Sequence, residues 1–302
     1  MDIKAEKGSR ERISFTGSDE NTLVGDLHRP VGDIHARTLV LLHGGGQTRH
    51  SWRSTADRLA ERGWTAVALD QRGHGDSDWV ECGKYRFDDF AQDLITVAGQ
   101  IEQKFHAKPV VVGASLGGIA GMLAEGETDR AILSALVLVD VTPRMRHDGV
   151  DKVLGFMAER ADHGFSTLEE ASDAIAAYLP HRPRPSDLSG LAKNLRLGAD
   201  NRYRWHWDPA FVSGENRAPT RAERNEIYKR LESAVKNIST PLMLVRGRAS
   251  ELVDEEMAAE FLKLAPDAEF ADVSEAGHMV AGDRNDVFTD AMIDFLDKHK
   301  NR

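Results

Sequence analysis

The feature that most restricts the fold is an alternation of short apolar runs with longer amphipathic segments. The apolar runs are almost unbroken Val, Leu and Ala, which is typical of strands covered on both faces of a parallel sheet. Strands separated by helices of this size predict βαβ units and hence an α/β fold. The expected strands are 12–16, 23–28, 38–42, 66–69, 109–112, 135–139, 241–246 and 269–273, and the expected helices between and after them are 54–62, 87–105, 116–125, 255–264 and 287–298.

The alternation stops after Asp140 and resumes about a hundred residues later, at the seventh expected strand. The segment between them contains helical stretches at 150–162 and 167–177, broken by prolines. Compact domains rarely contain an unstructured loop of this length. We therefore expect one core domain and a helical cap inserted after the sixth strand. The core domain is formed by residues 1–142 and 236–302, and the cap by residues 143–235.

The strongest motif is Gly-Ala-Ser-Leu-Gly at residues 113–117, between an expected strand and an expected helix. A serine in this context stands on a sharp strand-to-helix turn, where only glycines leave room for the neighbouring chain. The turn exposes the hydroxyl above the sheet and near a helix N-terminus, which favours developing negative charge. The motif predicts that Ser115 is a nucleophile.

A second motif, His-Gly-Gly-Gly at residues 43–46, ends the third expected strand. Glycines there allow backbone N–H groups to face a cavity without obstruction by a Cβ atom. One such N–H, together with that of the residue after the nucleophile, stabilises the oxyanion of acyl transfer. We expect these donors to be Gly45 and Leu116. A phosphate-binding loop is the alternative, but neither of its two glycine signatures is present.

A general base is expected at His278, which follows the last expected strand. The order nucleophile, acid, histidine is the one typical of hydrolases with this strand-to-helix serine. The imidazole would take the serine proton and later deliver it to the leaving group. Glu251, in the loop after strand 241–246, is the first choice for the acid, and Asp140 is the competing choice. Asp254, which is typical of a helix N-cap, and Asp272 are weaker choices.

Four motifs, in order along nearly the whole chain, resemble the α/β-hydrolase superfamily. They are His-Gly-Gly-Gly at 43–46, Asp-Gln-Arg-Gly-His-Gly-Asp-Ser at 70–77, Gly-Ala-Ser-Leu-Gly-Gly at 113–118 and Gly-His at 277–278. The resemblance implies an α/β-hydrolase fold, in which the turn at 70–77 is architectural rather than catalytic. Serine at position 115, in place of aspartate, argues against the epoxide-hydrolase and haloalkane-dehalogenase branches. Ser250-Glu251 stands where many relatives carry an aspartate.

These residues predict a serine hydrolase that needs no cofactor and cleaves a carboxylic ester or lactone through an acyl-enzyme. The alternatives are a C–C bond hydrolase, a cofactor-free haloperoxidase-like enzyme, and a non-catalytic ligand receptor on the same fold. Trp205 and Trp207 either line the substrate pocket from the cap or pack the cap onto the core, and packing is slightly favoured. No His, Asp and Glu cluster has metal-ligand spacing, so no metal is expected.

Composition narrows the class of partner. The 302 residues include 39 Lys and Arg against 49 Asp and Glu, a net charge of −10, which argues against nucleic acid. No apolar run reaches the roughly 18 residues that cross a bilayer, and the charged N-terminus lacks the apolar stretch of a signal peptide. The single cysteine, Cys82, suits a reducing cytosol. We expect a cytoplasmic protein acting on a small molecule, without a nucleic-acid or membrane partner; the oligomeric state is not indicated.

Overall fold

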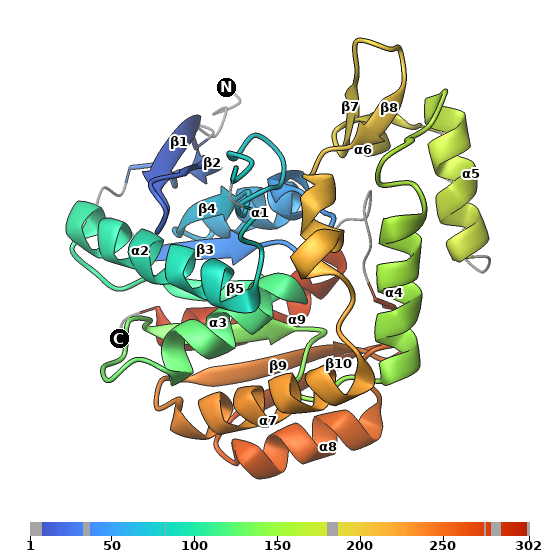
Figure 1. The fold of residues 1–302 in the computed structure, drawn as a ribbon. Helices are drawn as coiled ribbons and strands as arrows, with labels where there is room; N and C mark the ends of the chain where they lie inside the picture. The colour runs from blue at the N-terminus through green and yellow to red at the C-terminus, as the bar shows by residue number, and fades with distance from the viewer. Residues whose placement is uncertain are drawn as a thin grey trace.

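The computed structural model describes residues 8–32, 37–81, 83–179, 187–274, 276–278 and 285–300, so that Cys82 lies outside the described residues. Its centre is an eight-stranded sheet in the order β1-β2-β4-β3-β5-β6-β9-β10 (Figure 1). The pairs β1·β2 and β2·β4 are antiparallel and the other pairs are parallel. The strands are β1 (Arg10–Thr16), β2 (Thr22–His28), β3 (Thr38–Leu42), β4 (Thr65–Leu69), β5 (Val110–Ala114), β6 (Ala135–Val139), β9 (Leu242–Gly247) and β10 (Glu269–Val273). The expected α/β-hydrolase fold is confirmed, with each expected strand within two residues of its expected ends.

Helices cover both faces of the sheet, which explains why its central strands are apolar without alternation. In β3, Val40 and Leu42 pack into the cluster that contains residues of α2, α3, α7 and α8, whereas Leu39 and Leu41 pack into the cluster on the face of α1 and α9. All four side chains are buried. The helices of the core are α1 (Arg53–Glu61), α2 (Phe87–Phe105), α3 (Leu116–Gly126), α7 (Arg221–Asn237), α8 (Glu255–Leu264) and α9 (Thr289–His299). No helix among the described residues is long and apolar enough to span a membrane.

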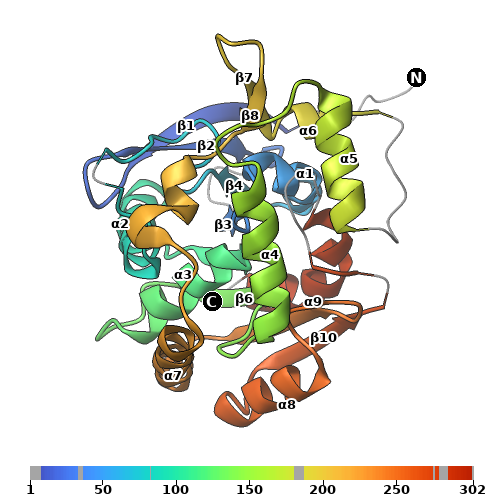
Figure 2. The same cartoon turned by 45° about the vertical axis from the view of Figure 1, so that its right-hand side comes forward.

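The segment after β6 forms a separate group of elements beside the core, and Figures 1 and 2 both show them together on one side of the sheet. They are α4 (His147–Glu159), α5 (Leu168–Tyr178), α6 (Ser189–Ala192), β7 (Leu195–Leu197), β8 (Tyr203–Trp205) and the 3-10 helices η2 (Pro209–Val212) and η3 (Gly214–Asn216). We call these elements the cap. It has its own apolar cluster, which includes Met157, Phe165, Trp205 and Trp207. The cap is not purely helical, because β7 and β8 form an antiparallel hairpin.

The last helix of the expected insertion, α7, packs as part of the core. Its residues Leu231, Ala234 and Val235 are buried in the same cluster as α2 and α3. Contact with α3 is so close that a Cβ atom on Gly126 would lie 2.2 Å from the carbonyl oxygen of Ala234. The helix also continues past the expected boundary at residue 235, to Asn237. The inserted segment that packs outside the core therefore ends before α7 begins.

Candidate active site

Ser115 stands between β5 and α3, at the carboxyl edge of the sheet. Its backbone has φ +46° and ψ −111°, a conformation that costs free energy in a residue with a side chain and is typical of functional turns. Glycines make the turn possible. A Cβ atom on Gly113 would lie 2.4 Å from the backbone of Gly117, and one on Gly117 would lie 2.5 Å from Leu42 Cβ. Ser115 is half-buried, so that it is partly open to solvent.

The glycine loop after β3 leaves one backbone amide free beside Ser115. Gly44 N–H donates to Gln47 Oε1 at 3.0 Å, and Gly46 N–H donates to His74 Nε2 at 3.1 Å. Gly45 N–H, between them, donates to no acceptor among the described residues, and neither does Leu116 N–H at the start of α3. A Cβ atom on Gly44 would lie only 3.4 Å from Ser115 Cβ. The two expected oxyanion donors, Gly45 N–H and Leu116 N–H, are thus both unpaired. They belong to two segments, the glycine loop and the start of α3, that approach each other at Ser115.

Two buried histidines hold the glycine loop in place. His43 Nε2 accepts the N–H of Gln71 at 3.1 Å, so its Nδ1 carries the proton and donates to the Gly44 carbonyl at 2.8 Å. His74 Nε2 accepts the N–H of Gly46, and its Nδ1–H donates to the Arg72 carbonyl at 2.9 Å. Burial lowers the pKa of His43 to about 4 and that of His74 to about 3. Both rings are therefore neutral near pH 7 and serve to position the loop.

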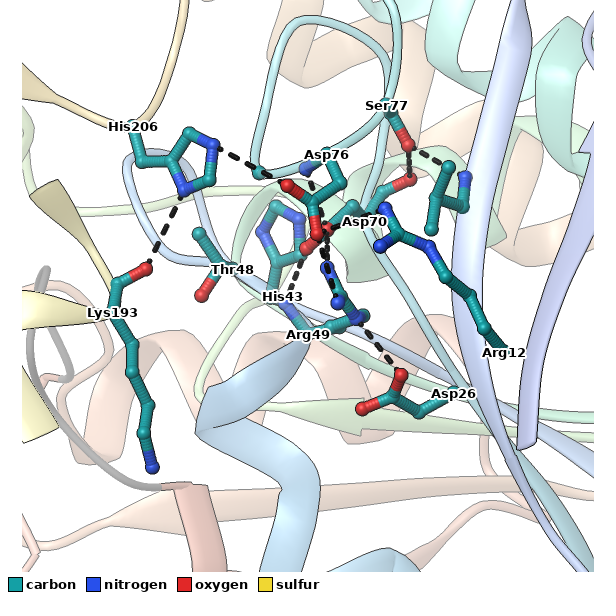
Figure 3. A network of polar contacts seen from close by, with 12 residues as sticks. Arg12, Asp26, His43, Thr48, Arg49, Asp70, Asp76, Ser77, Lys193 and His206 are labelled. Carbon is teal, nitrogen blue, oxygen red and sulfur yellow. Dashed lines mark hydrogen bonds and ion pairs between the residues drawn. The ribbon is translucent and has the colours of Figure 1, made fainter. Parts of the chain in front are cut away.

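A buried arginine ties the end of the glycine loop to the turn at 70–77 (Figure 3). Arg49, which opens the 3-10 helix η1 (Arg49–Trp52), pairs through Nη1 with the fully buried Asp70. Its Nη2 lies 2.9 Å from Asp76 Oδ2 and its Nε 3.2 Å from Asp26 Oδ1. Burial by itself would lower the pKa of Arg49, but the carboxylates of Asp70 and Asp26 raise it. Asp76 also faces the cap, where His206 Nε2 lies 3.8 Å from its Oδ1.

His278 contacts Asp140, which lies directly after β6. His278 Nδ1 lies 2.8 Å from Asp140 Oδ2, and both side chains are buried. Two further donors hold the carboxylate: Gly247 N–H at 3.1 Å from Oδ1, and Ser250 Oγ at 2.8 Å from Oδ2. Asp140 has φ +52°, so it and Ser115 are both strained residues at the ends of neighbouring strands. The carboxylate is thereby oriented to fix the tautomer and direction of the imidazole.

The expectation that Glu251 contacts His278 is wrong. Glu251 forms an ion pair with Lys152 of α4, and both of these side chains are partly exposed. Asp254 caps α8, as its position suggested, and Asp272 pairs with Arg246. The structure brings the competing choice, Asp140, to the histidine instead. The loop that contains Glu251 contributes to the site through its Ser250 hydroxyl and Gly247 amide.

Side chains of the cap lie close to the glycine loop. A Cβ atom on Gly45 would lie 3.4 Å from the ring of Phe211, and one on Gly46 would lie 3.1 Å from Met157 Cε and 3.6 Å from Trp207 Nε1. The structure separates the two expected pocket tryptophans. Trp205 packs within the cap, with its ring 5.2 Å from that of Phe165, whereas Trp207 also contacts the glycine loop.

The arrangement joins a strained serine, an oriented imidazole and two unpaired amides at the carboxyl edge of one sheet. Ser115 Oγ makes no hydrogen bond to another described residue. Catalytic contacts of this kind often tighten only when substrate is bound. The residues that sequence reasoning missed are Ser250, which supports Asp140, and the positioning histidine His43. The hydroxyl at position 250, where a carboxylate is expected, was the available signal. Among the described residues, no group of three His, Cys, Asp or Glu side chains could hold a metal ion.

The chain is similar to known proteins over most of its length. The family model described as serine aminopeptidase, S33, matches residues 33–285. The esterase Rv0045c of Mycobacterium tuberculosis is 30% identical over 255 residues, which are 82% of this chain and 79% of the relative. The 2-(acetamidomethylene)succinate hydrolase of Mesorhizobium japonicum is 30% identical over 245 residues, or 80% of this chain and 81% of the relative.

Solved structures show the same fold. An α/β hydrolase of Novosphingobium aromaticivorans matches with a TM-score of 0.76 at 23% identity, over 97% of this chain and 100% of that one. The structure of the Mycobacterium tuberculosis esterase matches with a TM-score of 0.70 at 25% identity, over 98% of this chain and 94% of that one. The strand order, the serine turn and these matches lead to one conclusion: the chain belongs to the α/β-hydrolase superfamily, in the family described as serine aminopeptidase, S33.

Proposed function

We propose that this chain is a serine hydrolase that cleaves a carboxylic ester or lactone through an acyl-enzyme intermediate. The observation that carries the proposal is the buried contact of His278 with Asp140, formed one strand away from the strained Ser115. The buried carboxylate of Asp140 is held by Gly247 N–H and Ser250 Oγ while it contacts the imidazole. Its charge would stabilise the imidazolium that forms during proton transfer.

The proposed reaction follows from the positions of these groups. Ser115 Oγ attacks the carbonyl carbon while His278 Nε2 takes its proton, and Asp140 stabilises the resulting imidazolium. The oxyanion accepts hydrogen bonds from Gly45 N–H and Leu116 N–H, the two unpaired amides. When the intermediate collapses, the leaving oxygen receives the proton from His278. Water then attacks the acyl-enzyme with His278 again acting as base, which regenerates Ser115 and releases the acid.

The choice of an ester or lactone rests on the relatives. Of the two relatives described above, one is named an esterase and the other a 2-(acetamidomethylene)succinate hydrolase. A C–C hydrolase or a ligand receptor would use the same pocket but would not accumulate an acyl-enzyme from simple esters.

The proposed partner is a small molecule rather than a nucleic acid, since the net charge of −10 repels phosphate. We also propose that the protein works in the cytoplasm, where one cysteine needs no disulfide partner. Separation of cytoplasm from the other fractions of the source cell, followed by immunoblotting, tests the second statement directly.

The proposed activity is tested with a series of p-nitrophenyl esters and aliphatic lactones, with wild type and Ser115→Ala compared at equal concentration. We expect turnover by wild type and a loss of kcat of at least about a thousandfold in the variant. The melting temperature of each protein serves as the folding control. Wild type that hydrolyses neither esters nor lactones would contradict the proposal.

A further inference from the structure

The hydroxyl of Ser250 is a donor whose direction is fixed by its own loop. Its oxygen accepts the N–H groups of Leu252 at 3.1 Å and Val253 at 3.2 Å. A serine hydroxyl has two acceptor lone pairs and a single proton. Because both lone pairs are occupied, the proton is left for the carboxylate of Asp140, whose Oδ2 lies 2.8 Å from Ser250 Oγ.

The oxygen that Ser250 holds is the one that contacts the histidine. His278 Nδ1 also lies 2.8 Å from Asp140 Oδ2, whereas Gly247 N–H lies at Oδ1. The torsion that turns an aspartate carboxylate has no sharp minimum, so its direction depends on the donors around it. With Ser250 in place, each oxygen of the carboxylate has a donor from the loop after β9, and Oδ2 stays directed at the imidazole.

The loop that contains Ser250 packs directly on α4 of the cap. A Cβ atom on Gly149 of this helix would lie 2.3 Å from the carbonyl oxygen of Glu251 and 2.8 Å from Leu252 Cδ2. At the start of the helix, Arg146 N–H donates to the Leu252 carbonyl at 2.9 Å. Backbone therefore meets backbone at this contact, and a larger residue at position 149 would have to displace the loop.

Building on the proposed function, we infer that Ser250 is a positioning residue for Asp140, and that the cap sets its place through the contact of Gly149 with the loop. Neither residue is required to touch the substrate. They act through Asp140 on the direction of the His278 imidazole, which must face the serine hydroxyl during proton transfer. Misplacement of a reacting group by about 1 Å can lower a rate by about a hundredfold.

The role of the hydroxyl is tested with Ser250→Ala and Ser250→Thr, on p-nitrophenyl butyrate. We expect Ser250→Ala to lower kcat and kcat/KM equally, by about ten- to a hundredfold, the effect of one hydrogen bond to a charged group. Ser250→Thr keeps the hydroxyl and should recover most of this loss. Rates are expressed per site labelled to completion by a fluorophosphonate, so that unfolded protein is not counted.

Two outcomes of this experiment would overturn the role of Ser250. One is a kcat of wild type in Ser250→Ala. The other is a Ser250→Thr variant as slow as Ser250→Ala, which would assign the loss to packing rather than to the hydroxyl. A change confined to KM would likewise place Ser250 in substrate binding instead.

Two glycines of α4 provide a matched pair for the contact with the cap. A Cβ atom on Gly155 would have no neighbour within 4 Å, in contrast to one on Gly149. Alanine favours a helix over glycine, so neither substitution should weaken the helix itself. We expect Gly149→Ala to lower kcat by about tenfold or more, because it displaces the loop, and Gly155→Ala to leave kcat unchanged. Equal kcat values in these two variants would overturn the role of the cap.

The double variant shows whether the cap acts through Ser250. If it does, Gly149→Ala should lower kcat much less in the Ser250→Ala background than in wild type, because the hydroxyl that it displaces is already absent. Effects of the two substitutions that simply multiply would mean that they act independently, and this result would overturn the coupling.

Failure of the inference is separable from failure of the proposed function. If wild type hydrolyses p-nitrophenyl butyrate and both Ser250→Ala and Gly149→Ala match it, the serine-hydrolase proposal stands and the inference is wrong. If wild type hydrolyses no ester and Ser115 does not react with a fluorophosphonate, the proposed function itself is wrong, and the inference falls with it.

Discussion

His278 Nδ1 lies 2.8 Å from Asp140 Oδ2, and this contact joins the loop after β10 to the end of β6. The carboxylate comes from the strand that borders the serine strand, not from the loop after β9. The strand before the cap therefore supplies the carboxylate that contacts the histidine, and the loop after β9 supplies donors that hold this carboxylate.

The first prediction separates the two carboxylates. Asp140→Asn removes the charge that stabilises the imidazolium and presents an amide to the histidine, so kcat should fall by about a hundredfold to ten-thousandfold. Glu251→Gln removes only a partly exposed ion pair with Lys152, and kcat should stay within about threefold of wild type. Steady-state kinetics on a p-nitrophenyl ester give both values. A collapse of activity in Glu251→Gln, with Asp140→Asn near normal, would reverse the assignment.

The sequence singled out Ser115 and His278 but ranked Asp140 only second as the partner of the histidine, and the reason is geometric. Ser115 and His278 are each fixed by a local motif at the end of a strand, and strands are short and regular. Which carboxylate reaches the histidine depends on the path of the loop after β9, where Ser250 Oγ accepts the N–H groups of Leu252 and Val253. That compact turn directs Glu251 toward α4. Loop paths of this kind are set by contacts between distant segments.

The structure of the cap was also only partly predictable from the sequence. Tyr203, Trp205 and Trp207 alternate with polar residues, and this period of two is the signature of a strand. Trp205 and Trp207 were expected either to line the pocket or to pack the cap, and the β7–β8 hairpin was not expected. The end of the cap was placed too late because α7 has helical periodicity like any cap helix. Only its packing on α3, at Gly126, shows that it belongs to the core.

A second prediction concerns pH. His74 is buried in its neutral form, and its pKa is lowered from 6.5 to about 3. Between about pH 3 and pH 6.5 the unfolded chain therefore binds a proton at this residue that the folded protein does not bind. Its contribution to stability is complete above about pH 6.5 and is lost as the pH falls toward 3, by up to about 1.4 kcal/mol per pH unit. His74→Gln, which offers an acceptor to Gly46 N–H without titrating, should make stability less dependent on pH in this range.

Urea unfolding at pH 4.5, 5.5, 6.5 and 7.5 gives the free energy of unfolding of variant and wild type. In the difference between the two proteins, the contributions of the other titrating histidines cancel. The variant's free energy of unfolding should decline less steeply below pH 6.5. Parallel curves for the two proteins would show that His74 is not buried in its neutral form.

A third prediction concerns the buried cation at the start of η1. Arg49→Met leaves Asp70, which is fully buried, without its partner, and we expect a loss of about 3 to 5 kcal/mol in the free energy of unfolding. Arg62→Met is the matched control, because Arg62 pairs with Asp297 at 3.0 Å where both side chains are exposed. It should cost at most about 1 kcal/mol. Equal effects in the two variants, measured by urea unfolding, would contradict the burial of this network.

A fourth prediction concerns the contact between core and cap. Tyr85 Oη donates to Asp208 Oδ2 at 2.5 Å, and Asp208 caps η2, the 3-10 helix that places Phe211 against Gly45. Tyr85→Phe removes a hydrogen bond to a charged acceptor and should cost about 1.5 to 3 kcal/mol in stability. It should also raise KM, since the cap side of the site loses its support.

Tyr203→Phe is the control for this prediction, because the Tyr203 hydroxyl makes no hydrogen bond among the described residues. A double-mutant cycle of Tyr85→Phe with Asp208→Asn should show a coupling energy of roughly 0.5 to 3 kcal/mol. Additive effects of the two substitutions would mean that Tyr85 and Asp208 do not interact in solution.

The central claim, that Ser115 is an activated nucleophile, is tested most directly by locating a covalent adduct. Wild type, Ser115→Ala and Asp140→Asn are incubated with a fluorophosphonate, digested and examined by mass spectrometry. The account predicts one phosphonylated residue, Ser115, in wild type, slower labelling in Asp140→Asn, and none in Ser115→Ala. An adduct on a different residue, or wild type that stays unlabelled while it hydrolyses esters, would contradict the account.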